Sequence, residues 1–279
     1  MLVQALDHFV VPVNDIVVAE DFYVQIFGGT ILKRVGLNVK TQVLGAHTFV
    51  QIAGKRIGVY LQKEERGQPI ASRGLPTYSF TTTKHGIEEV MDMLQRWKIS
   101  FEGPQKNTHR FATTTLFFAD PAGNNFVVYV PKNEGLSTTA IASRLTGVGY
   151  LELEAPKLDD SIRFYRAVLG FEIVSRGHDA KSGRNQAVLR MASGQNLFLT
   201  EAPFGPKGYP MSRKIPGPHL GFYVAPHQWR EALAQLDSLG IPHGDRGEEA
   251  KGRHAGGNTG TYMDDPAGYV IQYISEGMQ

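Results

Sequence analysis

Hydrophobic and polar residues alternate in short runs along the chain, and the final quarter shows this pattern most plainly. Alternation over residues 219–224 predicts a strand, and apolar positions at helical spacing predict an amphipathic helix over residues 229–239. A Gly-rich hairpin follows, then an apolar run at 259–263, an Asp-Pro-Ala-Gly turn at 265–268 and a strand that ends at Ile274. The pattern therefore predicts one βαβββ module.

Two motifs occur twice at nearly the same separation. The turn Asp120-Pro-Ala-Gly recurs at Asp265, 145 residues later, and Phe22-Tyr recurs at Phe164-Tyr, 142 residues later. A repeat of this length predicts a duplicated half. Since proline fixes φ and glycine accepts a positive φ, the Asp-Pro-Ala-Gly motif itself is explained by a tight turn.

The repeat sets the expected domain organisation. We expect one domain at residues 1–131, a polar, Ser/Thr-rich linker at 132–144 and a second domain at 145–279. Asn14 or Asp15 can cap the first helix, and Gly28-Gly29 can end it.

Each half contains the module twice, which predicts an α+β fold of four βαβββ modules. Outside the final module, helices are expected at 16–27, 87–97 and 158–169, and strands at 6–13, 29–35, 42–52, 57–62, 77–82, 116–119, 126–130, 150–154, 171–176, 186–191 and 197–200.

Composition narrows the function classes. An apolar fraction of 42% in 279 residues is ample for a folded core. There is no cysteine, which excludes disulfides and thiolate chemistry. The net charge of +2 is spread without a basic block, so a nucleic-acid partner is not expected, and neither a membrane span nor a signal peptide is predicted. We expect a cytoplasmic protein.

The four modules, the Phe-Tyr motifs and the Asp-Pro-Ala-Gly turns together resemble the vicinal oxygen chelate superfamily, which includes glyoxalases, bleomycin resistance proteins and extradiol dioxygenases. The resemblance covers nearly the whole chain and implies two glyoxalase-like domains with cup-shaped sheets. In that superfamily, two modules form a cup that holds a divalent metal ion. The ligands come from the first strand and the closing strand of each module.

The two motifs serve as rulers for these ligand positions in all four modules. The positions are occupied by His8 and Tyr60 in the first module, Thr77 and Val127 in the second, Tyr150 and Phe198 in the third, and His219 and Gln272 in the fourth. By resemblance to hydroquinone-type ring-cleaving dioxygenases, pairing the first and fourth modules implies a single metal site of His8, His219 and Gln272. The other cup lacks ligands.

Two imidazoles and one oxygen donor suit non-haem Fe(II), with Mn(II), Zn(II) and Ni(II) as alternatives. Ring-cleaving members carry glutamate where this chain has Gln272, so the site is one unit more positive. Glu276 shares a strand face with Gln272, but four residues place it roughly 13 Å away, too far to substitute.

Other side chains are candidates for the same cup. By the same resemblance, Tyr262, His254 and Arg253 occupy positions of groups that move protons or neutralise an anionic substrate. His47 is a further candidate, and His109-Arg110 is expected to be surface. The long Pro/Gly loop at 203–218 is either a lid or a surface connection.

The predicted function is a metal-dependent dioxygenase that opens a hydroxylated aromatic ring of the catechol or hydroquinone type, with dioxygen as co-substrate. Two alternatives stay open: a glyoxalase-type lyase or isomerase, and a metal-free protein that sequesters an aromatic compound. The sequence leaves the oligomeric state open, a homo-oligomer included.

Overall fold

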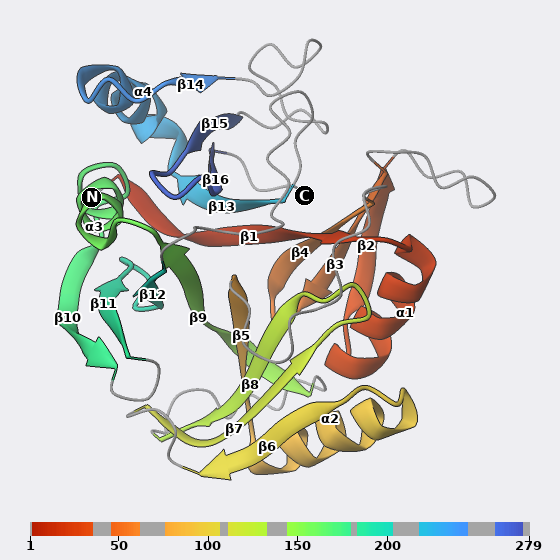
Figure 1. Cartoon of the computed structure of the whole chain (residues 1–279). Helices are drawn as coiled ribbons and strands as arrows, with labels where there is room; N and C mark the ends of the chain where they lie inside the picture. The colour runs from red at the N-terminus through yellow and green to blue at the C-terminus, as the bar shows by residue number, and fades with distance from the viewer. Residues whose placement is uncertain are drawn as a thin grey trace. The chain divides into compact units, whose positions relative to one another are not determined.

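The structure is a computed structural model, and it describes residues 2–35, 46–61, 76–106, 111–132, 144–179, 183–202, 218–244 and 260–275. Over these residues the chain forms four successive modules, each with one α-helix and four strands in the order βαβββ (Figure 1). The predicted α+β fold of four such modules is therefore confirmed.

The modules follow one another without overlap. The first contains β1 (Val3–Val13), α1 (Ile16–Phe27), β2 (Thr30–Val35), β3 (His47–Ile52) and β4 (Lys55–Leu61). The second contains β5 (Thr77–Thr82), α2 (Lys84–Arg96), β6 (Phe101–Lys106), β7 (Ala112–Ala119) and β8 (Asn125–Pro131). The third contains β9 (Leu145–Ala155), α3 (Leu158–Ala167), β10 (Glu172–Asp179), β11 (Arg184–Arg190) and β12 (Asn196–Glu201). The fourth contains β13 (His219–Val224), the short 3-10 helix η1 (Pro226–Gln228), α4 (Trp229–Ser238), β14 (His243–Gly244), β15 (Gly260–Asp264) and β16 (Val270–Ile274).

The chain separates into two compact units, a first unit of Met1–Val10 with Glu152–Gln279 and a second unit of Val11–Leu151. Among the described residues, the strands of each unit are hydrogen-bonded in two runs. The strand orders are β14-β15-β16-β13-β1 and β10-β11-β12-β9 in the first unit and β4-β3-β2 and β5-β8-β7-β6 in the second, and the boundaries after Val10 and Leu151 divide β1 and β9 between the units. The domain boundaries at 131 and 145 follow the sequence repeat instead and stay a prediction.

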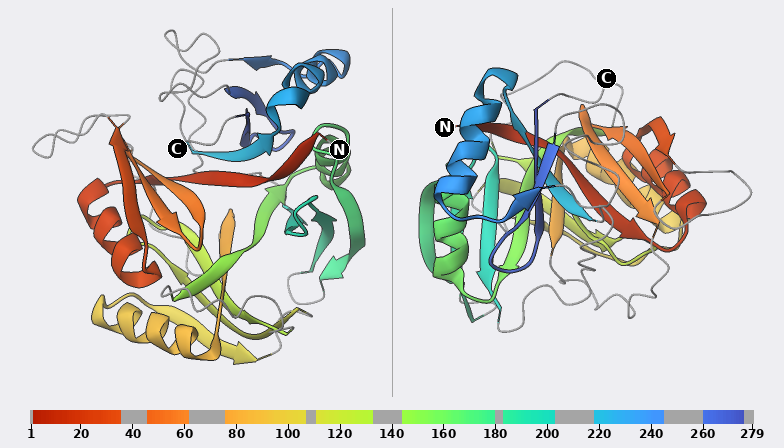
Figure 2. Two further views of the ribbon diagram at one scale, coloured as in Figure 1. Left: turned by 180° about the vertical axis from the view of Figure 1, so that it is seen from behind. Right: turned by 90° about the horizontal axis from the view of Figure 1, so that it is seen from above.

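Local signals explain how α1 begins and ends. The Asp15 carboxylate accepts hydrogen bonds from the backbone N–H groups of Val17 and Val18 at 2.8 and 3.1 Å, which caps the first turn. Gly28 ends the helix with a φ of 69°, a conformation that favours glycine. The helix packs on β3 and β4 and contacts α2, within the second unit (Figure 2).

Aromatic rings fill the space between the helices and the sheets of each unit. In the second unit, Phe27 of α1 contacts Phe80 of β5 and Phe126 of β8, with ring centroids 5.1 and 5.2 Å apart. In the first unit, Tyr165 of α3 stacks on Phe171, which in turn contacts Phe222 of β13. The apolar helix faces that the spacing predicted therefore form the two cores.

The two repeated motifs are hydrogen-bonded to each other. The Tyr23 hydroxyl donates to Asp120 at 2.9 Å in the second unit, and the Tyr165 hydroxyl donates to Asp265 at 2.9 Å in the first. Both carboxylates also accept backbone N–H groups of their own turns. Burial raises the pKa of Asp265 to about 6 and also raises the pKa of Asp120. Each Phe-Tyr helix is thereby fixed to the turn before a closing strand.

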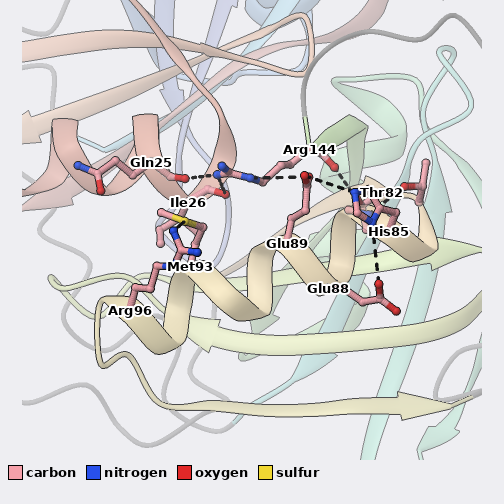
Figure 3. Close-up of polar contacts among 11 residues, drawn as sticks. Gln25, Ile26, Thr82, His85, Glu88, Glu89, Met93, Arg96 and Arg144 are labelled. Carbon is pink, nitrogen blue, oxygen red and sulfur yellow. Dashed lines mark hydrogen bonds and ion pairs between the residues drawn. The ribbon is translucent and has the colours of Figure 1, made fainter.

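Arg144, the last residue of the predicted linker, joins three elements of the second unit (Figure 3). Its guanidinium donates to the carbonyl oxygens of Gln25 and Ile26 at the C-terminal end of α1 and lies 3.8 Å from the Glu89 carboxylate of α2. The Arg144 carbonyl accepts a hydrogen bond from the Thr82 hydroxyl. A cation at this end of α1 also complements the partial negative charge of the helix.

Several elements depart from the expected bounds. β9 begins at Leu145 rather than at residue 150, although it includes glycines that the pattern disfavours in strands. β6 and the two-residue β14 were not predicted, since Gly103-Pro104 interrupts the first and the second is very short. Among the described residues, no helix is long and apolar enough to cross a membrane.

Candidate functional site

Four adjacent strands of the first unit place their side chains in one row across the sheet. His8 of β1 lies opposite Gly221 of β13, Gly221 opposite Gln272 of β16, and Gln272 opposite Tyr262 of β15. Directly paired residues lie on the same face of the sheet. His219 lies on this face too, because it is two residues before Gly221 on the same strand. We call His8, Gly221, Gln272, Tyr262 and His219 the histidine row.

The two imidazoles face each other through their Nε2 atoms, which are 3.0 Å apart. Their rings meet edge to face, with centroids 5.1 Å apart and an interplanar angle of 87°. Both side chains are buried, with 1% of His8 and 4% of His219 exposed. When both rings are neutral, these facing nitrogens can share one proton or direct two lone pairs at a common point.

Gly221 makes room for the His8 ring. A Cβ atom at this position would lie 2.3 Å from His8 Cε1 and less than 3 Å from both ring nitrogens. Such contacts are far below van der Waals distance, so any larger residue would displace the imidazole. The glycine between the two histidine strands is therefore part of the site.

Asp7 holds the other nitrogen of His8. Its Oδ2 atom accepts a hydrogen bond from His8 Nδ1 at 2.7 Å. Successive strand residues normally point to opposite faces, but the pairing of β1 with β13 shifts between Leu6 and His8, which marks a β-bulge at Asp7. The bulge explains how neighbouring residues come into contact.

Gln272 is completely buried, and neither its Oε1 nor its Nε2 has a hydrogen-bond partner among the described residues. Leaving a buried polar atom without a partner costs about 1–3 kcal/mol. Tyr262, opposite Gln272 on β15, is 6% exposed and meets the His219 ring edge to face at 5.4 Å. The unpartnered amide lies on the same sheet face as two imidazoles, and this combination indicates a ligand-binding position.

These residues fit a divalent ion. Two nitrogen ligands, each about 2.1 Å from an ion and at right angles to each other, are about 3.0 Å apart, and the two Nε2 atoms have this separation. The Gln272 amide can add an oxygen donor from the same face of the sheet. No cluster of three or more His, Cys, Asp or Glu side chains that could hold a metal occurs among the described residues, so the amide is the third candidate donor.

A profile of the Glyoxalase/Bleomycin resistance protein/Dioxygenase superfamily matches the chain twice, at residues 5–128 and 147–273. The chain belongs to this superfamily. The predicted resemblance is therefore confirmed, and members of the superfamily typically bind divalent metal ions. No curated protein matches the sequence.

Two solved structures share the fold at low sequence identity. A putative dioxygenase from Bacillus subtilis is 15% identical, with a TM-score of 0.71 over 98% of this chain and 85% of that chain. Glyoxalase I from Zea mays is 14% identical, with a TM-score of 0.64 over 97% of this chain and 92% of that chain. At these identities the likeness establishes the fold alone.

The second unit contains a row at the positions that the superfamily repeat makes equivalent. Ser79 of β5 lies opposite Val127 of β8, and Val127 lies opposite Phe117 of β7. The Ser79 hydroxyl donates to the Tyr150 carbonyl at 2.7 Å and accepts from the Tyr150 N–H at 2.6 Å. We call Tyr150, Ser79, Val127, Phe117 and Thr77, which lies two residues before Ser79, the counterpart row.

Aromatic rings pack around the counterpart row. Tyr150 contacts Tyr129 and Phe111, with ring centroids 5.7 and 5.4 Å apart, and Phe111 also contacts Tyr129. Burial raises the pKa of Tyr129 to about 12, so its hydroxyl stays protonated at physiological pH.

The remaining superfamily candidates fall into two groups. His254, Arg253, His109-Arg110, Glu276 and nearly all of the proposed lid at 203–218 lie outside the described residues. His47 is described, and its ring stacks on Tyr60 in the second unit, with centroids 6.4 Å apart.

Sequence reasoning missed Asp7 and Gly221. The signal for Gly221 was available, because a glycine two residues after His219 sits on the same strand face. Asp7 could not be found from alternation, which places it on the face opposite His8.

Proposed function

We propose that the chain is a metal-dependent ring-cleaving dioxygenase that acts on a hydroxylated aromatic compound of the catechol or hydroquinone type. The observation that carries this proposal is the pair of imidazole Nε2 atoms 3.0 Å apart, beside a buried amide without a described partner. Two nitrogens and one oxygen on one sheet face form a donor set that would hold a divalent ion.

His8, His219 and Gln272 would hold the ion, with Fe(II) as the best match to this donor set and Mn(II), Zn(II) or Ni(II) as alternatives. The ion would supply Lewis acidity and the electron transfer that dioxygen chemistry requires. The similarity in fold to a putative dioxygenase agrees with this assignment without deciding it.

The protein side chains would orient the substrate and move its protons. Tyr262 lies beside His219 and opposite Gln272, so its side chain can position a substrate hydroxyl and relay the proton that this hydroxyl releases. His254 and Arg253 are proposed for proton transfer and for neutralising an anionic substrate. The burial of the row would exclude water from the reacting oxygens.

The test loads the purified full chain with Fe(II) under anaerobic conditions and measures oxygen uptake with catechol, with hydroquinone and with the monohydric control phenol. We expect the wild-type protein to consume one dioxygen per dihydroxy substrate and to release a ring-opened acid. The rate of oxygen uptake in His8→Ala and His219→Ala should fall below about 1% of the wild-type rate. Thr77→Ala, at the position equivalent to His219 in the counterpart row, is the matched control and should keep full activity.

Other outcomes would overturn the proposal. Conversion of a methylglyoxal hemithioacetal without oxygen uptake would assign the chain to the glyoxalase type. Binding of an aromatic compound by protein that takes up no metal ion would identify a sequestering protein.

A further inference from the structure

We propose that Asp7 is the positioning residue of the site, fixing His8 so that Nε2 carries the lone pair and supplying the negative charge that Gln272 lacks. The part of this inference that concerns a metal ion rests on the proposed function. The part that concerns the tautomer of His8 stands on the geometry of the metal-free protein.

The first step is the backbone. Leu6 pairs with Phe222 and His8 pairs with Gly221, so two residues of β1 advance against one of β13. Asp7 is the extra residue of this bulge, and bulges re-aim side chains near functional sites. A regular strand would point the Asp7 carboxylate away from the sheet face that carries His8.

The second step is the direction of the hydrogen bond. A carboxylate only accepts hydrogen bonds, so at 2.7 Å the proton between Asp7 and His8 sits on Nδ1. A neutral imidazole with a proton on Nδ1 has its lone pair on Nε2. That nitrogen is the one that faces His219 at 3.0 Å.

The third step is charge. His8, His219 and Gln272 are neutral donors, so they leave both positive charges of a divalent ion uncompensated. The Asp7 carboxylate contacts the imidazole from behind, and its side chain is only 16% exposed. A carboxylate in this position makes an imidazole a stronger donor. Asp7 does not complete a group of three such side chains able to hold a metal, so its place is behind His8 and not on the ion.

The counterpart row provides an internal comparison. The residue equivalent to Asp7 is Gly149, which precedes Tyr150. A Cβ at Gly149 would lie 2.5 Å from the Tyr129 ring, so no carboxylate can be accommodated there. The chain therefore carries the carboxylate next to the imidazole and omits it where a tyrosine replaces that imidazole.

The experiment compares wild type with Asp7→Ala, which removes both the hydrogen bond and the charge, and Asp7→Asn, which keeps an acceptor without the charge. Histidine ¹⁵N shifts of the metal-free protein report the tautomer of His8, and chelator competition reports the Kd for Fe(II) and for Mn(II). Asp92→Asn, which removes an exposed carboxylate of α2, is the matched control.

We expect Asp7→Ala to lose the Nδ1-protonated tautomer and to raise the Kd by about 10–100-fold. Asp7→Asn should keep most of the tautomer preference and raise the Kd by a smaller factor. Unchanged ¹⁵N shifts and Kd in Asp7→Ala would overturn the positioning role, and a wild-type Kd in Asp7→Asn would overturn the charge role. Wild-type protein that binds no metal ion would overturn the proposed function and the charge role, and the ¹⁵N shifts would still decide the tautomer.

Discussion

The histidine row and the counterpart row occupy equivalent strands, yet only the first carries imidazole side chains. Tyr150 stands in place of His8, Ser79 in place of Gly221 and Val127 in place of Gln272. The histidine row leaves a buried amide without a described partner, whereas the Ser79 hydroxyl of the counterpart row is bonded to the Tyr150 backbone. One row retains an unpartnered amide, whereas the Ser79 hydroxyl of the other row is bonded within that row.

The difference shows that a duplicated fold can keep the same strands while the side chains on them differ in polarity and hydrogen bonding. Buried polar groups are normally paired, because each unpaired atom lowers stability. A row that retains such atoms indicates a requirement other than folding. The Ser79 hydroxyl of the counterpart row pairs with the Tyr150 backbone, so this group is satisfied without a ligand.

The largest effect is expected when an imidazole is removed. His8→Ala or His219→Ala should raise the Kd for Fe(II) by more than the 10–100-fold typical of losing a group that only supports a ligand. Thr77→Ala and Tyr150→Phe, the equivalent changes in the counterpart row, should leave the Kd unchanged. Calorimetric titration measures the Kd of all four variants. Equal Kd values for the histidine-row variants and the counterpart-row variants would show that the two rows do not differ in metal binding.

Exchanging the polarity of the two closing strands should change stability in opposite directions. Gln272→Met removes two unpartnered buried atoms and should stabilise the metal-free protein by about 1–3 kcal/mol while weakening metal binding. Val127→Gln buries a new amide and should destabilise it by a similar amount. Urea unfolding measures both, and a less stable Gln272→Met variant would mean that the amide already has a partner.

Filling the space beneath His8 should affect both folding and binding. Gly221→Ala places a methyl group against the imidazole and should cost about 1–3 kcal/mol in stability, with weaker metal binding. Gly177→Ala is the control, because a Cβ there meets nothing within 4 Å, and it should change stability by less than about 0.5 kcal/mol. Thermal unfolding separates the two, and equal effects would contradict the assigned role of Gly221.

The smallest effects are expected for the hydrogen bond between a helix tyrosine and a turn aspartate, which both halves contain. Tyr23→Phe and Tyr165→Phe each remove one hydrogen bond to a turn aspartate and should cost about 0.5–1.5 kcal/mol without changing metal affinity. Because the Tyr165 hydroxyl lowers the pKa of Asp265, its loss should raise that pKa further above 6. Carboxyl ¹³C titration measures the shift, and a lower pKa would contradict it.

The stability of the fold should depend on pH through the carboxyl group of Asp265. Its pKa is raised from an ordinary value of 3.8 to about 6 in the folded protein, so protonation stabilises the fold fully below pH 3.8. This contribution is lost as the pH rises through about 6, and Tyr165→Phe should move the loss to higher pH.

The sequence by itself determined the four modules and the position of α1 between Asp15 and Gly28. Together with the resemblance to the superfamily, it also pointed to His8, His219, Gln272 and Tyr262, which the strand pairing places in one row. The modules and the helix depend on local periodicity, capping and a countable repeat, which are all written in the order of the residues, whereas the choice of site positions came from the resemblance. The same counting could not reveal that the Phe-Tyr and Asp-Pro-Ala-Gly motifs bond to each other, although both were found.

Only the tertiary structure decided which atoms face one another. The bulge that turns Asp7 toward His8 depends on how β1 pairs with β13, and the space above Gly221 depends on the ring that occupies it. Pairing between strands more than 200 residues apart is set by packing of the whole sheet. A pattern with a period of two residues carries no information about a strand that locally departs from that period.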